Sequence, residues 1–218
     1  VMVGFNRRFD PHFQHLQQRI MDGAIGKVEL VSINSKDPSP PPLAYIRVSG
    51  GLLRDMTIHD LDMARHLLQE DITAVNAQAS CQVDQAIGVA GDVDTAVINL
   101  ATASGKLVQI ANSRRTTYGY DQRIEVHGEL GMLSAGNVAE NMVTEYNSNG
   151  VTGALPMHFF LQRYAVSYRM ELDTFIKVVQ GEIVDYPGLN DGLQALLLAE
   201  AAHVSWTEGR TVDPQQLH

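Results

Sequence analysis

The sequence predicts an α+β fold in which an open, mixed and largely antiparallel β-sheet is covered by helices on one face. Strand-like segments cluster between residues 72 and 146, and helical patterns lie before and after them. Gly105, Gly128-Glu-Leu-Gly131 and Asn147-Ser-Asn-Gly150 mark short turns, and short connections join antiparallel neighbours. One domain over residues 1–218 is the simplest account of this pattern.

The chain opens with a short apolar segment that is followed by a helix signal. Val1–Phe5 is typical of a strand cut from the middle of a longer protein. Asp10 and Pro11 have the residue types of a helix N-cap and first helical position, and we expect this helix to end at Gly23.

A stiff loop separates the next strand from the most informative helix. Val28–Ile33 alternates as a strand does. The prolines of Asp37–Pro42 exclude a helix and indicate an extended loop that reaches toward Gly50. After the glycine pair, an amphipathic helix is predicted to run to about Leu68.

The rest of the chain reads as strands followed by two long helices. The last helix carries an apolar stripe of Leu193, Leu196, Leu197 and Ala201. The predicted strands are Ala74–Val83, Thr95–Thr102, Leu107–Arg114, Asp121–His127, Met132–Ala135 and Met142–Tyr146, and the predicted helices are Phe160–Gln180 and Leu189–Glu208.

Composition restricts the class of protein. With 44% hydrophobic and 19% charged residues among 218, a packed globular protein is expected. The formal net charge of -9 argues against nucleic acid and anionic membranes as main partners. The sequence shows no secretory signal and no apolar run near the roughly 20 residues that span a bilayer. The single cysteine, Cys81, fits a reducing, cytoplasmic location.

The helix after Gly51 carries the strongest candidate site. Asp55, His59 and Asp62 project within roughly 60° of one another, opposite the leucine stripe. Two carboxylates and an imidazole in a cleft could move protons to and from a hydroxyl at neutral pH. The same residues could be a solvated helix face, or ligands for zinc or manganese, although there is no second histidine–carboxylate cluster. We therefore expect no metal.

Other candidate residues lie at the ends of strands. Arg7 follows the opening segment and could bind a carboxylate, a phosphate or hydroxyls, or be a surface arginine. Ser35, Lys36 and Asp37 end the second strand just before the proline loop, which is a common place for binding groups. Tyr120 lies in a Tyr-Gly-Tyr turn, where its phenol could bind a polyol or simply pack.

Taken together, these motifs resemble the C-terminal domain of the Gfo/Idh/MocA oxidoreductases, most closely that of the bacterial inositol 2-dehydrogenases. The resemblance rests on Gly4-Phe-Asn-Arg-Arg-Phe-Asp10, on Gly50-Gly-Leu-Leu-Arg-Asp-Met-Thr-Ile-His-Asp-Leu-Asp62 and on Tyr118-Gly-Tyr-Asp121 in the right order and spacing. It implies a glyceraldehyde-3-phosphate dehydrogenase-like C-terminal domain for substrate binding and oligomerisation. Residues 1–9 would end the link from an N-terminal Rossmann domain that this chain lacks.

The resemblance also implies roles for individual residues. Asp55 and His59 match the catalytic aspartate and histidine, and Asp62 matches an acid that contacts polyol hydroxyls. Arg7 and Tyr120 match further pocket residues, and Ser35 stands where some members have histidine. NAD(P) would be bound mainly by the missing domain, because no Gly-x-Gly-x-x-Gly occurs here.

The implied reaction is the oxidation of an inositol hydroxyl to a ketone by hydride transfer. His59, titrating near pH 6.5, would take the hydroxyl proton, with Asp55 orienting or charging its ring. The fragment alone is expected to be inactive and to form dimers or tetramers through its open sheet face. Alternatives are a sugar dehydrogenase of the same family, a non-catalytic polyol-binding or oligomerisation module, and a metal-dependent sugar isomerase.

Overall fold

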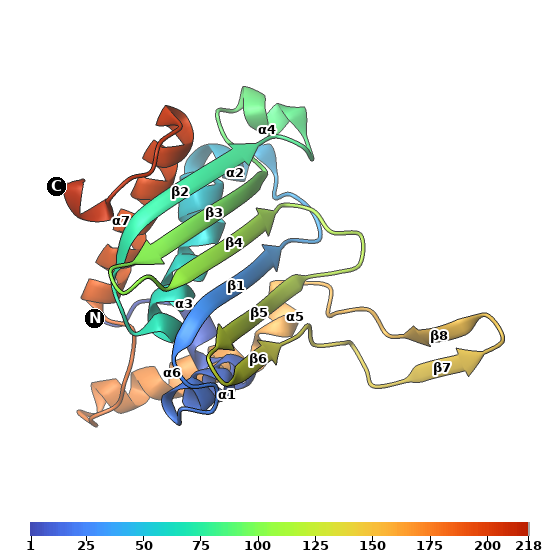
Figure 1. The fold of residues 1–218 in the computed structure, drawn as a ribbon. Coiled ribbons are helices and arrows are strands. Elements are labelled where there is room, and N and C mark those ends of the chain that lie inside the picture. The colour runs from blue at the N-terminus through green and yellow to red at the C-terminus, as the bar shows by residue number, and fades with distance from the viewer. Residues whose placement is uncertain (218) are drawn as a thin grey trace.

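The computed structural model describes residues 1–217, and its centre is a six-stranded sheet in the order β2-β3-β4-β1-β5-β6 (Figure 1). Strands β1 and β4 are parallel, whereas the other neighbours in this order are antiparallel. The strands are β1 (Val28–Lys36), β2 (Ile72–Ser80), β3 (Thr95–Thr102), β4 (Leu107–Ser113), β5 (Asp121–Gly128) and β6 (Gly131–Ala135). The predicted open, mixed sheet is confirmed.

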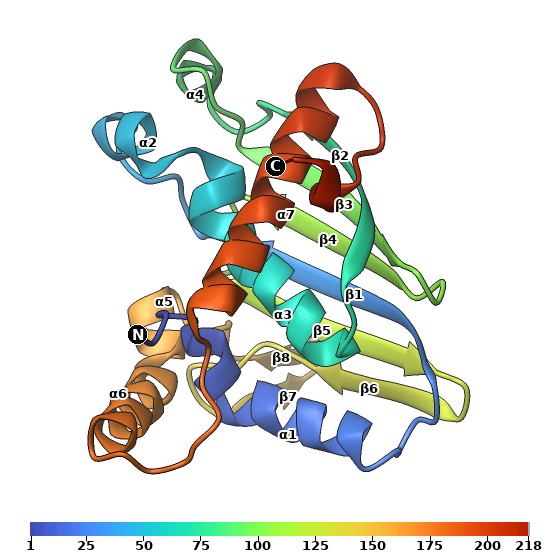
Figure 2. The ribbon, with the colours of Figure 1, turned by 90° about the vertical axis from the view of Figure 1, so that its left-hand side faces the viewer.

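Helices cover one face of the sheet and leave the other uncovered (Figures 1 and 2). Helix α7 packs against β2, α3 against β1 and α1 against β6, while α6 packs against the short helix η1. The helices are η1 (Asn6–Phe9, 3-10), α1 (Pro11–Met21), α2 (Leu43–Ser49), η2 (Leu53–Thr57, π), α3 (Ile58–Leu68), α4 (Gln85–Val89), α5 (Phe160–Arg163), α6 (Ala165–Val179), α7 (Leu189–Glu208) and η3 (Pro214–Gln216, 3-10).

The core lies between this sheet and its helices. On β3, Ala96, Ile98 and Leu100 are buried, whereas Val97 and Asn99, which alternate with them, are exposed. Successive side chains of a strand point to opposite faces, so this alternation is that of a sheet buried on one side. The predicted arrangement of helices on a single face is therefore confirmed.

The beginning of the chain differs from its prediction in one respect. Val1–Phe5 forms no strand, because within residues 1–217 no strand of the sheet pairs with it. Asp10 does cap α1: its carboxylate accepts hydrogen bonds from the backbone N–H groups of His12 and Phe13. The capping satisfies donors that the first helical turn leaves unpaired.

Two helical predictions need correction. The segment after Pro42 is not extended up to Gly50, because α2 occupies most of it. Helix Phe160–Gln180 is two helices that meet at Tyr164. The short helix α4 was not predicted.

Helix α7 has its predicted bounds, but of its predicted stripe only Ala201 is buried. Leu193 and Leu196 are exposed, and the core side carries mainly small residues instead. The buried residues of α7 are Ala195, Leu198, Ala199, Ala201, Ala202 and Ser205. Small side chains allow α7 to approach β2 and α3 closely, and Leu193 and Leu196 point away from this contact.

Two further strands, β7 (Thr144–Asn147) and β8 (Gly150–Gly153), form a hairpin that projects beyond β5 and β6 (Figure 1). The sequence predicted the first of these strands and not the second. Within residues 1–217, no helix has the length and apolarity needed to cross a membrane.

Candidate active site

A cavity of about 800 Å³ lies where η1, the proline loop, the π-helical turn η2 and α5 converge. Its apolar lining includes Pro40–Pro42, Phe159 and Phe160. Its lining also contains two arginines, two aspartates, one histidine and four tyrosines: Arg7, Arg114, Asp37, Asp55, His59, Tyr45, Tyr120, Tyr164 and Tyr168. Of the seven residues predicted from the sequence, the structure brings Arg7, Asp55, His59 and Tyr120 together here.

The π-helical turn positions Asp55 at the cavity. Gly51 has a φ of +84°, which turns the chain sharply before the helix. The Leu52 N–H then donates to both carboxylate oxygens of Asp92, at 3.0 and 3.1 Å. This hydrogen bond satisfies a backbone donor at the start of the turn. Single π-helical turns inside helices are frequent at functional sites.

Both oxygens of the Asp55 carboxylate have donors. The Tyr45 hydroxyl donates to one at 2.6 Å, and the Arg114 Nη2 donates to the other at 3.2 Å. Arg114 is almost completely buried, so its guanidinium is a fixed support rather than a mobile surface group. Within residues 1–217, no hydrogen bond joins Asp55 to His59.

His59 presents a neutral imidazole to the cavity. Its Nδ1 is buried and has no hydrogen-bond partner among the described residues. The ring packs edge-on against Phe5, with 5.9 Å between centroids. Burial, and then the charge of Arg7, lower the pKa of His59 to about 3. The expectation that this ring titrates near pH 6.5 is therefore wrong for this chain.

Arg7 is held by a buried network beneath the cavity. Its guanidinium forms an ion pair with Asp60 and donates a hydrogen bond to the Ser35 hydroxyl at 3.0 Å. The Asn112 amide donates to Asp60 at 2.8 Å, and the Thr57 hydroxyl donates to Asn112 at 2.6 Å. The ion pair and these hydrogen bonds fix Arg7, and Ser35 supports it from outside the cavity lining.

Tyr120 and Tyr164 form an aromatic wall. Their rings meet edge to face with 6.0 Å between centroids. Burial raises the pKa of Tyr164 to about 12 and raises that of Tyr120 as well. Both phenols are therefore protonated at neutral pH. The Tyr164 hydroxyl donates to the Gln122 side-chain oxygen at 3.3 Å, whereas the Tyr120 hydroxyl remains available as a donor.

Three predicted residues lie outside the cavity lining. Ser35 and Lys36 are neighbours on β1, so their side chains point to opposite faces of the sheet and could not both reach one site. Ser35 is buried on the covered side, and Lys36 lines a groove on the uncovered side. Asp62 is buried and bound by the guanidinium of Arg8 at 2.5 and 2.8 Å.

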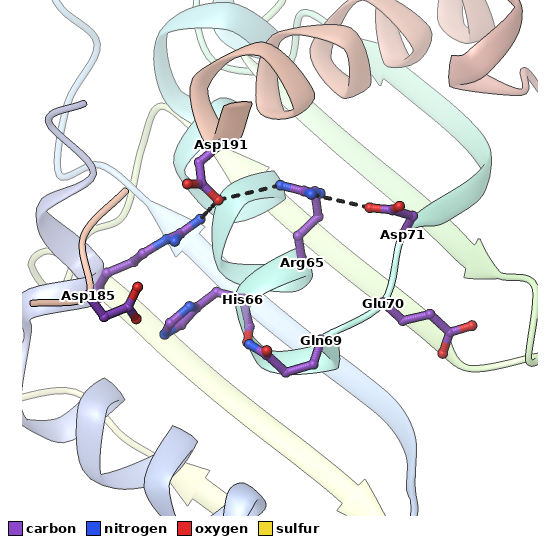
Figure 3. Close-up of a pocket in the computed structure, with 8 residues that line it drawn as sticks. Arg65, His66, Gln69, Glu70, Asp71, Asp185 and Asp191 are labelled. Atoms are coloured by element: carbon purple, nitrogen blue, oxygen red, sulfur yellow. Dashed lines mark hydrogen bonds and ion pairs between the residues drawn. The ribbon is translucent and has the colours of Figure 1, made fainter. Parts of the chain in front are cut away.

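The position of Asp62 shows what helical spacing leaves undetermined. Periodicity gives the direction around a helix, but Asp62 lies about 10 Å further along the axis than Asp55. There Arg8 joins Asp62 to Asp191 and borders a separate polar pocket of about 360 Å³. Figure 3 shows Arg65 of this pocket between Asp71 and Asp191, with His66 beside Asp185.

The sequence analysis did not single out Tyr45 or Arg114 as site residues, whereas Asp37, which it named with Ser35 and Lys36, does line the cavity. Parallel neighbours β1 and β4 end side by side, and the Asp37 N–H donates to the Ser113 carbonyl at 2.9 Å. Charged residues directly after two adjacent strands were the signal for Asp37 and Arg114. Tyr45 lies on α2, which was not predicted, so no comparable signal existed for it.

The described residues contain no cluster of three or more His, Cys, Asp or Glu side chains arranged as metal ligands. Arginines, phenols, two carboxylates and a neutral imidazole instead surround a partly apolar space. Such a lining suits a small neutral molecule with several hydroxyl groups.

An open-sheet α+β domain of this kind matches the C-terminal domain of a family of oxidoreductases. The model of the GFO/IDH/MocA C-terminal domain matches residues 13–134, and the chain belongs to this family.

Several relatives are similar over nearly the whole chain. Inositol 2-dehydrogenase from Rhizobium meliloti (strain 1021) is 51% identical over 97% of this chain, which spans 64% of that protein's length. The crystal structure of a myo-inositol dehydrogenase from Corynebacterium glutamicum is 42% identical with a TM-score of 0.93, covering 98% of this chain and 64% of that one.

A third relative was solved with ligands. The scyllo-inositol dehydrogenase from Lactobacillus casei, with bound NAD(H) and scyllo-inositol, is 26% identical with a TM-score of 0.88. The match covers 98% of this chain and 64% of the Lactobacillus casei chain.

Proposed function

We propose that this chain is the substrate domain of an NAD(P)-dependent oxidoreductase that oxidises a hydroxyl of a cyclic polyol, an inositol, to a ketone. The observation that carries the proposal is the neutral imidazole of His59 at a cavity lined by phenols, arginines and carboxylates. The inositol dehydrogenases that resemble the chain over nearly its full length support the substrate class.

The residues of this chain would bind and orient the polyol and accept its proton. Tyr120 and Arg7 would donate hydrogen bonds to substrate oxygens, and His59 would accept the hydroxyl proton. Asp55, held by Tyr45 and Arg114, would favour the transient positive charge on His59. A ring with a low pKa releases that proton readily once the alcohol has reacted.

NAD(P), when bound, supplies the acceptor for the hydride. The chain has no glycine-rich phosphate loop, so the dinucleotide would be held mainly by a preceding nucleotide-binding domain of a longer parent protein. Asp62 and Lys36 lie outside the cavity lining, and we leave them out of the proposed binding set.

The proposal extends to assembly and location. The uncovered sheet face exposes Val97 and Leu107 among small and polar side chains, and a second copy would cover it in a dimer or tetramer. The single cysteine supports a reducing cytoplasm as the compartment.

His59→Ala in the longer parent tests the role of the imidazole. We expect turnover of myo-inositol to fall by roughly 10²–10⁴-fold, because a positioned general base contributes about that much. His15→Ala, on the exposed side of α1, is the matched control and should leave turnover unchanged. Steady-state kinetics with NAD give the rates, and thermal unfolding reports the fold. Equal loss of activity and stability would make His59 a structural residue.

A further inference from the structure

Asp92 lies behind the candidate site, in the connection between α4 and β3 and outside the cavity lining. Its backbone is tied on both sides: the Asp92 N–H donates to the Ile87 carbonyl at 3.1 Å, and the Asp92 carbonyl accepts from the Cys81 thiol at 3.2 Å. Its side chain is 12% exposed. A carboxylate held in this way is a fixed support for the groups that contact it.

The Asp92 carboxylate contacts both parts of the chain that hold Asp55. Its two oxygens accept from the Leu52 N–H, and Leu52 directly precedes the π-helical turn that carries Asp55. The Asp92 Oδ2 also lies 3.9 Å from the Nη2 of Arg114. The same Nη2 donates to the Oδ2 of Asp55 at 3.2 Å. Asp92 therefore closes a ring of contacts that reaches Asp55 through the backbone of the turn and through a guanidinium.

The guanidinium of Arg114 is shared between two carboxylates. The side chain of Arg114 is 2% exposed, so solvent screens these two interactions little. A guanidinium held by Asp55 alone would neutralise that carboxylate more completely than one that also faces Asp92. The second ion pair therefore leaves more of the negative charge of Asp55 available to the protonated form of His59.

We propose that Asp92 is a positioning residue that acts on the reaction through Asp55, because it fixes the start of the turn and shares the guanidinium of Arg114. This inference rests on the proposed function, in which Asp55 favours the transient charge on His59. It extends that function to a side chain outside the cavity. The proposed binding groups of the polyol are on other segments, so we expect the effect of Asp92 in kcat rather than in KM.

Two substitutions in the longer parent separate the two contacts of Asp92. Asp92→Asn keeps an oxygen for the Leu52 N–H but removes the charge that faces Arg114, and kcat for myo-inositol should fall about tenfold. Asp92→Ala removes both contacts, and kcat should fall about 100-fold because Asp55 is displaced. KM should stay nearly unchanged in both variants. A rise in KM with an unchanged kcat would contradict the proposal.

A double-mutant cycle tests whether Asp92 acts through Asp55. In an Asp55→Asn background, Asp92→Asn should cost little further turnover, since the carboxylate on which it acts has already lost its charge. A purely structural role would lower kcat by the same factor in both backgrounds. The matched control is Asp84→Ala, which removes the cap of the neighbouring helix α4 at the Ala86 N–H. This control should lower the unfolding temperature and leave kcat unchanged.

Crystal structures of the parent and its Asp92→Ala variant give a result that does not depend on turnover. The Asp55 carboxylate should move away from the Tyr45 hydroxyl and from Arg114 in the variant. An unmoved carboxylate, or equal factors in the cycle, would overturn the inference. If Asp92→Ala does not fold, the cycle with Asp92→Asn decides. A parent that oxidises no inositol while Asp55 is displaced in the variant would contradict the proposed function and support the positioning of Asp55.

Discussion

At the scale of single residues, the burial of His59 links the candidate site to folding stability. An unfolded histidine has a pKa near 6.5, whereas the folded ring has one of about 3. Between these values the unfolded chain binds a proton that the folded chain does not bind. The free energy of unfolding therefore falls as the pH drops from about 6.5 toward 3. His66, whose pKa burial lowers to about 4, acts in the same direction, and Asp37 acts in the opposite one.

Replacing His59 by glutamine isolates its share of this effect. Glutamine stays neutral, so the variant should lose less stability than the wild type between pH 7.5 and pH 4.5, by on the order of 1–3 kcal/mol. Urea unfolding of both proteins at the two pH values measures the difference. If both lose the same free energy, the burial of this ring does not control its protonation.

At the scale of elements, the π-helical turn depends on the backbone before it. A Cβ added to Gly51 would lie 2.7 Å from the Asp92 Oδ1 that accepts the Leu52 N–H. Glycine is therefore required twice, for its positive φ and for the space that Asp92 occupies. Gly91 shares the positive φ, at +87°, but has open space around it.

Gly51→Ala and Gly91→Ala separate these two requirements. Gly91→Ala should destabilise the chain by roughly 1–2 kcal/mol through backbone strain alone. Gly51→Ala should cost roughly 1–3 kcal/mol more, because the methyl group displaces Asp92. Chemical denaturation at neutral pH compares the two. Equal losses would show that the Asp92 anchor does not hold the turn.

At the scale of the whole molecule, the 217 described residues leave two surfaces uncovered. One is the open sheet face. The other, here called the helix face, comprises Leu172, Phe175 and Val179 of α6 and Leu189 and Leu193 of α7. On α6 these residues lie along one side, and Val179 is 70% exposed. Exposed apolar side chains that gather along one side of a helix mark an interaction site.

The start of the chain is close to the helix face. The Val3 N–H donates to the Pro187 carbonyl, just before α7, at 2.8 Å. A domain that precedes Val1 in the longer parent would therefore emerge beside this surface. Val1–Phe5, which has the sequence of a strand but no partner strand in residues 1–217, would join the sheet of that domain.

Carbene footprinting of the 218-residue chain and of the longer parent distinguishes the two surfaces. Labelling of the helix face should be high in the chain at every concentration and low in the parent. Labelling of Val97 and Leu107 should fall as concentration rises in both proteins, because a second copy covers the sheet. The exposed Val89 of α4 serves as the unchanged control. Equal labelling of the helix face in both proteins would contradict the expected domain contact.

Local patterns determined much of this protein. The alternation of β3, the capping residue of α1 and the limits of α7 depend on neighbours in sequence, and the structure agrees with them. The motif after Gly51 likewise indicated Asp55 and His59 as residues of one site. Such features follow from the sequence because hydrogen bonds and side-chain direction repeat within a few residues.

Only the tertiary structure decided which charges meet. Asp62 and Asp55 belong to one helical segment, yet Arg8 binds the first and Arg114 supports the second. Strand β1 ends at Lys36, and of the three residues Ser35, Lys36 and Asp37 only Asp37 lines the cavity. The burial of His59 shifted the pKa of its ring far from the ordinary value. Ion pairing and burial depend on residues distant in sequence, so the packing of the folded chain sets the chemistry of each group.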